Sequence, residues 1–263
     1  MKNNSSSFFI NRNVTSMIKK DALIGNPIYY FDEITSTFDK IKEFPLREGL
    51  TVVSKKQSKG RGRLGRNWSS EEGGVYFSFY LTPDTSPEEA TFATIICALG
   101  TAKALQKYGN CSIKWPNDIV MNKKKICGIL TTMGATADKL EYICVGIGIN
   151  VNKDKFDEDL PYASSLKIET KKICDENQIL CDVLESIEKI YTTYNSEKVI
   201  SEYKKYCITI GNTIKVHYAD GSENFSGKCI GIKKDGSLIV QKENKTITVN
   251  SGEVSVRGLY GYV

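Results

Sequence analysis

The chain has 263 residues, of which 40% are hydrophobic and 25% charged, and its 36 basic and 31 acidic residues give a net charge of +5. These values are ordinary for a globular protein with one large domain, or with a main domain and a small partner. This net charge is compatible with anionic ligands or an acidic partner protein, but it is too small to indicate DNA binding by itself. No apolar run approaches the roughly 20 residues that cross a bilayer, so no membrane partner is expected.

The thiols and the single imidazole of the chain bear on two further kinds of site. Eight cysteines are scattered without a Cys-x-x-Cys pair, and His217 is the only histidine. We therefore expect no zinc site and no Cys/His nucleophile, but free thiols in a reducing compartment such as the cytoplasm.

The first 20 residues carry four basic residues and no acidic one. This segment weakly resembles an organellar transit peptide, although we prefer to interpret it as a disordered tail.

The first predicted elements follow this tail. Apolar runs at 28–31, 50–53 and 75–81 predict strands, and residues 38–44 have the pattern of a short helix that Pro45 ends. The next segment, Ser86-Pro-Glu-Glu89, is a capping box with proline at the first helical position. A helix should begin there and end at Gly109.

The second half of the chain contains more strand patterns and one long helical pattern. Segments rich in Ile, Val and aromatic residues predict strands at 112–115, 126–132 and 142–149. Residues 178–206 predict a helical stretch, because apolar side chains recur there at spacings of three and four. Short strands separated by turns are then predicted at 213–218, 225–232, 237–241 and 246–250. We therefore predict an N-terminal tail at 1–24, an α+β domain at 25–207 and a small β-barrel at 208–263.

The most informative motif is Gly60-Arg-Gly-Arg-Leu-Gly-Arg-Asn-Trp68. Glycine lets backbone amides approach a ligand closely, and arginine binds phosphate or carboxylate oxygens with two donors. Trp68 adds a flat apolar face that can cover a ring. The alternative is a solvated, RNA-binding Arg-Gly tail. The predicted strands on both sides of the motif instead favour a loop inside a folded domain.

Three further segments carry residues of the same chemistry. Lys114-Trp-Pro-Asn-Asp118 puts a cation and a carboxylate around a rigid turn, and Lys123–Leu130 carries lysines into a strand. Gly146-Ile-Gly-Ile-Asn150 is a strand against which a ligand can lie. A solvated lysine run and glycines required for packing are the alternatives for the last two.

Together these motifs resemble the biotin–protein ligase family, which includes biotin–[acetyl-CoA-carboxylase] ligases and holocarboxylase synthetases. The match runs from about Ser36 to Asn150, and Ser255-Val-Arg257 is similar to the motif of the family's C-terminal domain. The resemblance implies a mixed-sheet catalytic domain of the biotin/lipoate ligase type, followed by an SH3-like barrel. It also implies activation of biotin with ATP to biotinyl-5′-AMP, and transfer of biotin to a lysine of a carboxylase carrier domain.

The resemblance assigns site residues position by position. The implied biotin-binding residues are Ser36, Thr37, Gln57, Gly60, Arg61, Gly62, Arg63, Lys125, Gly128 and Gly146. The implied ATP- or adenylate-binding residues are Arg63, Arg66, Trp68, Asn117, Lys125, Asn150 and Arg257. The implied catalytic residues are Arg61, Lys114, Asp118 and Lys125. Positioned cations lower the barrier to bringing a carboxylate toward a polyphosphate, with Mg²⁺ bound mainly by the ATP phosphates and Asp118 as a candidate protein ligand.

Two departures and three alternatives accompany this resemblance. Phe38 stands where many relatives have a polar residue, and Leu64 replaces an arginine that some relatives carry. A lipoate–protein ligase is the nearest alternative, although the chain has no Arg-Arg-x-Ser-Gly-Gly-Gly segment. A ligase that is also a repressor would need an N-terminal winged helix, for which the 27 residues before Ile28 are too few, so no DNA partner is expected. An RNA-binding module is the third alternative, and the sequence leaves a homodimer open.

Overall fold

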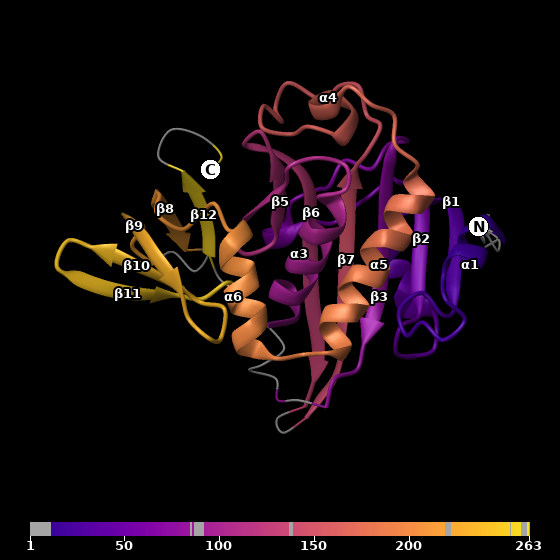
Figure 1. Ribbon diagram of the computed structural model, residues 1–263, viewed down its shortest axis with the longest axis horizontal. Helices are drawn as coiled ribbons and strands as arrows, with labels where there is room; N and C mark the ends of the chain where they lie inside the picture. The colour runs from indigo at the N-terminus through magenta and orange to yellow at the C-terminus, as the bar shows by residue number, and fades with distance from the viewer. Residues whose placement is uncertain are drawn as a thin grey trace, which may run out of the picture.

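The protein is described from a computed structural model that covers residues 12–84, 86, 92–136, 139–218, 222–252, 254–258 and 262. Its strands form two separate sheets (Figure 1), one of seven strands and one of five. The larger sheet consists of β1 (Ile28–Ile34), β2 (Thr51–Gln57), β3 (Gly74–Leu81), β4 (Ser112–Lys114), β5 (Asp118–Met121), β6 (Lys124–Ala135) and β7 (Leu140–Asn150). Its order is β1-β2-β3-β7-β6-β5-β4.

The larger sheet is mixed, as predicted. Strands β1 and β2 pair in parallel, and all other neighbours in this sheet pair antiparallel. Its helical elements are α1 (Arg12–Met17), α2 (Thr37–Lys40), η1 (Ile41–Glu43), η2 (Arg63–Gly65), α3 (Phe92–Leu105), α4 (Leu166–Thr170), α5 (Glu176–Thr192) and α6 (Ser196–Tyr206). The combination of a mixed sheet with helices confirms the α+β class.

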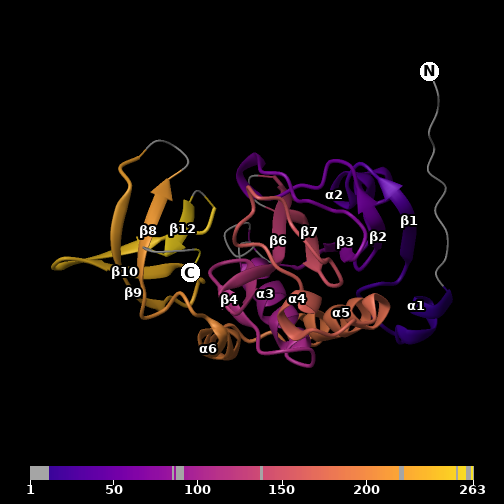
Figure 2. The ribbon, with the colours of Figure 1, turned by 90° about the horizontal axis from the view of Figure 1, so that it is seen from above.

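The helices divide unequally between the two faces of this sheet (Figure 2). Helices α3 and α5 cover one face, and nearly every residue of α3 is buried there against the apolar stripe of α5. The short α2 lies on the opposite face, where Phe31, Phe38, Ile41 and Tyr80 form a second, smaller core. Burying the first face fixes the sheet, since apolar burial is the main favourable term in folding. The second face is only partly covered and is left for a ligand site.

Several predicted element boundaries need correction. The helical stretch at 178–206 is two helices, because Asn195 caps α6 by accepting a hydrogen bond from the Lys198 amide. Tyr194, whose spacing continues the apolar stripe of α5, lies in the connection between the two helices and is 49% exposed. Helix α3 ends at Leu105 and is followed by turns that reach Gly109. The predicted helix start at 86–89 falls mostly outside the described residues. Strand β5 and helix α4 were not predicted.

The N-terminal segment differs from the disordered tail that we expected. Residues 12–24 lie against α5, with Val14 fully buried and Ile24 nearly so. The backbone amide of Ile24 also donates a hydrogen bond to Glu188 Oε2 at 2.8 Å. The expectation of disorder in the first 20 residues is therefore wrong for residues 12–20, and residues 1–11 lie outside the described part of the chain.

The smaller sheet contains β8 (Thr213–Tyr218), β9 (Phe225–Ile232), β10 (Leu238–Lys242), β11 (Lys245–Val249) and β12 (Val254–Gly258). All neighbouring strands pair antiparallel in the order β11-β10-β9-β8-β12. Four of these strands match the predicted ones closely, and β12 was known only as a motif. The expected small all-β unit at the C-terminal side is confirmed.

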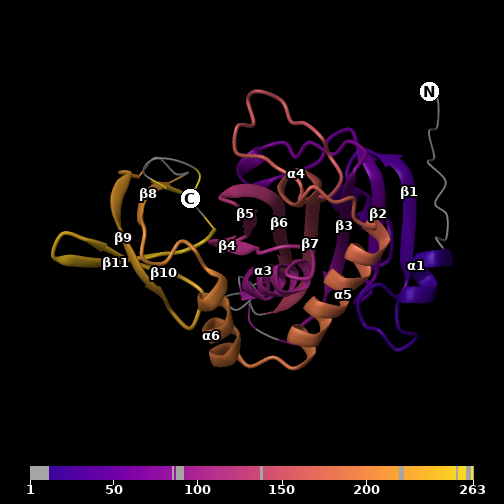
Figure 3. The ribbon, with the colours of Figure 1, turned by 45° about the horizontal axis from the view of Figure 1, so that its top comes forward.

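The two sheets are joined through Trp115, which is buried at their junction. Its indole Nε1 donates to the carbonyl of Gly236 at 2.9 Å, and its backbone amide donates to Thr209 Oγ1 at 2.9 Å. The hydroxyl of Tyr203 on α6 donates to the carbonyl of Pro116 at 3.0 Å. Helix α6 lies between the smaller sheet and the rest of the chain (Figures 1 and 3). This junction brings β12 to the open face of the larger sheet.

Two further observations concern the cysteines and the helices. Each of the eight cysteines is a free thiol, and all but Cys174 are buried. Among the described helices, none has both the length and the apolar character that a membrane span requires.

Candidate active site

A cavity of about 390 Å³ opens on the face of the larger sheet that α3 and α5 leave uncovered. This volume lies in the range of small-molecule sites, roughly 300–1,000 Å³. Its walls come from α2, the glycine–arginine loop at 60–68, the ends of β4 to β7, residues 156–163 and β12. Every site residue predicted from the sequence lines this cavity except Gly60.

Hydroxyl and amide groups line the end of the cavity next to α2. Ser36 caps α2 by accepting the Phe38 amide, and the Thr37 amide donates to Gln57 Oε1 at 2.7 Å. Thr37 Oγ1 lies 2.9 Å from Ser78 Oγ, and Gln57 Nε2 donates to Ser70 Oγ at 2.8 Å. Gln57 thus holds Thr37 in place, and the hydroxyls of residues 37 and 78 are the polar groups of this end.

Phe38 forms the apolar wall beside these hydroxyls. A Cβ added at Gly146 would lie 2.9 Å from the Phe38 ring, so the ring rests directly on the glycine of β7. The ring is nearly fully buried and belongs to the smaller core with Phe31 and Ile41. The departure at position 38 therefore exchanges a polar side chain for an aromatic core residue.

The loop at 60–68 is a narrow hairpin rather than an open strap. Arg61 and Asn67 form a bridge, and the amide of Trp68 donates to the Gly60 carbonyl at 2.8 Å. A Cβ at Gly60 would lie 2.4 Å from the carbonyl oxygen of Trp68, so glycine is needed for the close approach of the two arms. Gly60 therefore has a structural role in this hairpin and does not line the cavity. At the tip, Leu64 has a φ of 55° and is exposed.

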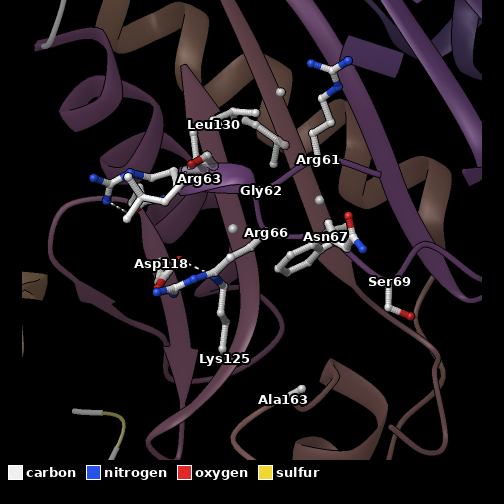
Figure 4. Close-up of a pocket in the computed structure, with 18 of the residues that line it drawn as sticks. Arg61, Gly62, Arg63, Arg66, Asn67, Ser69, Asp118, Lys125, Leu130 and Ala163 are labelled. Carbon is white, nitrogen blue, oxygen red and sulfur yellow. Dashed lines mark hydrogen bonds and ion pairs between the residues drawn. The ribbon is translucent and has the colours of Figure 1, made fainter. Parts of the chain in front are cut away.

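The first two arginines of the loop point in different directions (Figure 4). Arg61 is exposed, and its Nε lies 2.9 Å from the carboxylate of Asp39, which does not line the cavity. Arg63 reaches the smaller sheet, where its guanidinium donates to the carbonyls of Ser251 and Val254. It also donates, at 3.1 Å, to Oδ1 of Asn117 in the turn between β4 and β5. The structure therefore separates Arg61 from the other three predicted catalytic residues, and it uses Arg63 to tie the loop to the second sheet.

Those three residues, Lys114, Asp118 and Lys125, form one charged cluster. Lys125 Nζ lies 2.5 Å from Asp118 Oδ1, and Lys114 Nζ lies 3.7 Å from Asp118 Oδ2. Burial lowers the pKa of Lys114 to about 8, against the opposing effect of Asp118 and assisted by Lys125, Arg257 and Arg66. Burial alone would raise the pKa of Asp118, but the two lysines outweigh it and hold that pKa below its ordinary value. The cluster thus carries an excess of positive charge at neutral pH.

Two arginines predicted to bind the nucleotide extend this positive region. Figure 4 shows Arg66 and Lys125 converging on Asp118. Arg257 on β12 lines the cavity from the smaller sheet, and its charge acts on Lys114. Among the residues described around the cavity, only Asp118 and the exposed Asp159 are acidic. Such an excess of cations suits an anionic ligand.

Trp68 covers the glycines in the middle of the sheet. A Cβ at Gly148 would lie 2.3 Å from the indole Nε1, and one at Gly128 would lie 3.0 Å from the six-membered ring. Lys125 Nζ lies 5.2 Å from the ring centroid. The two glycines are paired across β6 and β7, so together they form the flat surface that the indole needs. Gly128 therefore belongs with Trp68 and Lys125, whereas Gly146 belongs with Phe38.

Two asparagines differ in how many partners their amides have. Asn117 has a partner for each atom of its amide, because Oδ1 accepts from Arg63 and Nδ2 donates to the Ile129 carbonyl at 2.6 Å. Asn150 at the end of β7 donates from Nδ2 to the Ser164 carbonyl at 3.0 Å. Its buried Oδ1 has no partner among the described residues. An unpaired buried acceptor is costly, so this oxygen is suited to a ligand donor.

The sequence analysis missed some residues of the cavity. Ser78 is one, although a serine in the apolar strand 75–81 is a detectable signal. The segment 156–163 is another, with its Tyr162 carbonyl accepting the Lys125 amide at 2.7 Å, and no motif marks it. Tyr262 is the third. Its hydroxyl donates to Asp118 Oδ2, and its ring lies 3.9 Å from Lys114 Nζ.

The donor set does not form a metal cage. Within the described part of the chain, no three His, Cys, Asp or Glu side chains gather as metal ligands. Both oxygens of Asp118 are already engaged, one by Lys125 and the other by Tyr262. A metal ion in this cavity would therefore depend on oxygens that a ligand brings with it.

Comparison with known families assigns both sheets to one kind of protein. Residues 28–150 match the family model of the biotin/lipoate A/B protein ligases. Residues 209–257 match the model of the biotin protein ligase C-terminal domain. The two matches fall on the larger and the smaller sheet, respectively.

Individual relatives agree with these models. The chain is 31% identical over 249 residues to the bifunctional ligase/repressor BirA of Bacillus spizizenii, covering 90% of this chain and 76% of the relative. It is 25% identical over 220 residues to a biotin–[acetyl-CoA-carboxylase] ligase of Mycobacterium tuberculosis, covering 79% of each. The structure of a biotin protein ligase from Aquifex aeolicus with biotin and ATP superimposes with a TM-score of 0.76 at 30% identity, covering 88% of this chain and 98% of that one. This chain therefore belongs to the biotin protein ligase family.

Proposed function

We propose that this protein is an ATP-dependent biotin–protein ligase that acts in two steps. In the first step, a carboxylate oxygen of biotin attacks the α-phosphorus of ATP, the bond to the β-phosphate oxygen breaks, and pyrophosphate leaves. In the second step, the amine of an acceptor lysine attacks the biotinyl carbonyl carbon. The bond from that carbon to the phosphate oxygen breaks, AMP leaves, and one proton is released.

The observation that carries this proposal is the order of chemistries along the cavity. Thr37, Ser78 and Phe38 place hydroxyls and an aromatic wall at one end, beside Gly146. Further along β7 lie Gly148, which Trp68 covers, and then Asn150, which marks the other end. The charged cluster of Lys114, Asp118 and Lys125 lies level with Gly148 and beside Trp68, because Asp118 pairs with Gly128 and Gly128 pairs with Gly148. A molecule with a small polar ring, an apolar chain, a phosphate and a purine, such as biotinyl-5′-AMP, has the same order of groups.

At the first end, the ureido ring of biotin needs polar groups on a rigid frame. Gln57 fixes Thr37 through two hydrogen bonds, and Thr37 Oγ1 contacts Ser78 Oγ. These hydroxyls can turn to meet the donors and acceptors of the ureido group without moving the backbone. Gly146 and Phe38 supply the apolar surface for the thiophane ring and the valeryl chain.

At the other end, Asn150 and Trp68 are suited to adenine. The free Oδ1 of Asn150 can accept a hydrogen bond from the exocyclic amine, which would satisfy the buried acceptor. The Trp68 indole offers a face for stacking. Asn117 contributes indirectly, by holding Arg63 and the end of β5 in place.

The lysine cluster provides the electrostatic part of catalysis. Adenylation brings a carboxylate toward a polyphosphate, so the barrier is lowered by cations that are held in position before the reaction. Lys125 is held by Asp118 and the Trp68 face, and Lys114, Arg66 and Arg257 surround the same space. Mg²⁺ would enter as the counter-ion of the ATP phosphates and neutralise part of their charge. Arg61 and Gly62 complete the wall on the loop side.

The test is a labelling reaction with purified protein. The protein is incubated with ATP, Mg²⁺, biotin and the apo carrier domain of an acetyl-CoA carboxylase, and labelled carrier is detected with avidin. We expect ATP-dependent biotin on one carrier lysine and none on a carrier whose acceptor lysine is changed to arginine. A parallel reaction with lipoate separates the alternative. Labelling of the carrier with lipoate and not with biotin would overturn the proposal.

A further inference from the structure

We propose that Tyr262 determines acceptor specificity by closing the acceptor side of the cavity until the carrier domain displaces it. The inference rests on the proposed ligase function, since it concerns the second step of that reaction. Tyr262 lies outside the motifs that carry the family resemblance, and the comparison with the C-terminal family model ends at residue 257.

Three contacts hold Tyr262 in the cavity. Its hydroxyl donates a hydrogen bond to Asp118 Oδ2, and its ring faces Lys114 Nζ at 3.9 Å. The ring also stacks on Tyr162, with centroids 5.7 Å apart and planes at 26°. Tyr262 therefore contacts two walls of the cavity, the β4–β5 turn and the segment 156–163. Figure 3 shows the last of these standing above the ends of β5 and β6.

The position of the hydroxyl is the one that an incoming amine would need. Asp118 is the only buried carboxylate among the described residues of the cavity, and Lys125 already occupies its Oδ1. Tyr262 occupies Oδ2. Because the pKa of Asp118 is held low, its carboxylate is a weak base. It is still a good hydrogen-bond acceptor that can orient an amine. An acceptor amine reaches Oδ2 only after Tyr262 has left.

The chemistry of the phenol fits such a closing residue. Burial, together with the nearby Asp118, raises the pKa of Tyr262 well above its ordinary value. The side chain therefore stays a neutral phenol and does not attack the adenylate itself. An aromatic ring also excludes water and small amines, which would otherwise react with the mixed anhydride. The neutral amine of a docked carrier lysine can donate a hydrogen bond to Asp118 in exchange for the one that Tyr262 loses.

The experiment compares specific and non-specific transfer in four full-length proteins: the wild type, Tyr262→Ala, Tyr262→Phe and Tyr194→Ala. Tyr194 is an exposed tyrosine outside the cavity and serves as the matched control. Each protein receives biotin, ATP and Mg²⁺. Pyrophosphate release measures adenylation, and the biotin hydroxamate formed with hydroxylamine, without carrier, measures leakage.

We expect Tyr262→Ala to raise hydroxylamine labelling per adenylate by about tenfold, as expected for loss of a charge-assisted hydrogen bond. Tyr262→Phe should give a smaller rise, because the ring remains, and Tyr194→Ala should match the wild type. Equal leakage in the wild type and in Tyr262→Ala, with adenylation intact, would overturn the inference. A loss of adenylation without added leakage would also overturn it, since the residue would then serve the first step. If the wild type releases no pyrophosphate with biotin, the proposed function fails instead.

Discussion

Replacing Arg63 with alanine should loosen the contact between the glycine–arginine loop and the smaller sheet. The guanidinium donates to the carbonyls of Ser251 and Val254 and to Asn117 Oδ1. All three acceptors belong to segments far from residue 63 in the sequence. The variant leaves these acceptors without their charged donor and gives the loop more freedom in the free protein.

The size of the effect follows from the kind of bond that is lost. A hydrogen bond to a charged group contributes about 1.5–3 kcal/mol, but water can reach part of this site once the side chain is truncated. We therefore expect the free energy of unfolding to fall by roughly 2–4 kcal/mol, less than the sum of three such bonds. Arg61→Ala is the matched control, because it removes an exposed ion pair with Asp39 that contributes about 1 kcal/mol or less.

The assay is urea unfolding of Arg63→Ala, Arg63→Lys and Arg61→Ala, followed by circular dichroism. Lysine keeps the charge but cannot present a planar fork to several acceptors, so Arg63→Lys should lie between the wild type and Arg63→Ala. The free Arg63→Ala loop should also let more biotinyl-AMP escape, which labelling of bystander proteins measures. If Arg63→Ala is destabilised no more than Arg61→Ala, the tie between the loop and the smaller sheet contributes nothing measurable and the reasoning fails.

Three further predictions concern single positions. Lys125→Ala should lower the rate of pyrophosphate release by a factor of about 10²–10³, because one positioned charge typically lowers a barrier by roughly 3–4 kcal/mol. A decrease of less than tenfold would contradict this role. Gly148→Ala should raise the KM for ATP by about tenfold, because the added Cβ would lie 2.3 Å from Trp68 and overpacking is costly. Gly252→Ala is the control and should leave this KM unchanged, because a Cβ there has no atom within 4 Å. Burial lowers the pKa of Lys153 to about 8, so between about pH 8 and 10.5 the unfolded chain binds more protons and the stability contributed by this group rises with pH. Urea unfolding across this window should therefore show that the stability of the wild type relative to Lys153→Met rises with pH, and equal pH dependence in both would refute it.

The sequence predicted the elements whose signals are local. The strands at 28–31 and 75–81 and the hairpins after residue 208 lie where apolar patterns and turn residues placed them. Two errors have physical causes that are not local. Strand β5 is only four residues long and follows directly from Asp118, so its pattern merges with the preceding turn. The break between α5 and α6 depends on Asn195 as a cap inside a continuous apolar periodicity.

The site was predicted as a set of residues but not as a set of contacts. Motif order identified every charged residue of the cavity's lining except Asp159, because the motifs stand at the separations typical of the family. Their partners could not be read from the sequence: Arg63 bonds to carbonyls almost 190 residues away, and Tyr262 bonds to Asp118 across 144 positions. Such pairs depend on how the second sheet sits on the first, and that placement is fixed by Trp115 and α6.

The two tryptophans of the chain provide independent optical probes of the two events that a ligase cycle requires. Trp68 lies in the cavity against Gly148, with Lys125 near its ring, so its emission should respond to whatever occupies the site. Trp115 is buried between the sheets and hydrogen-bonded to Gly236, so its emission should respond when the sheets separate. A protein with Trp115→Phe would then report ligand entry alone, and one with Trp68→Phe would report movement at the junction. The unmodified chain thus carries its own spectroscopic labels for timing substrate capture against domain motion.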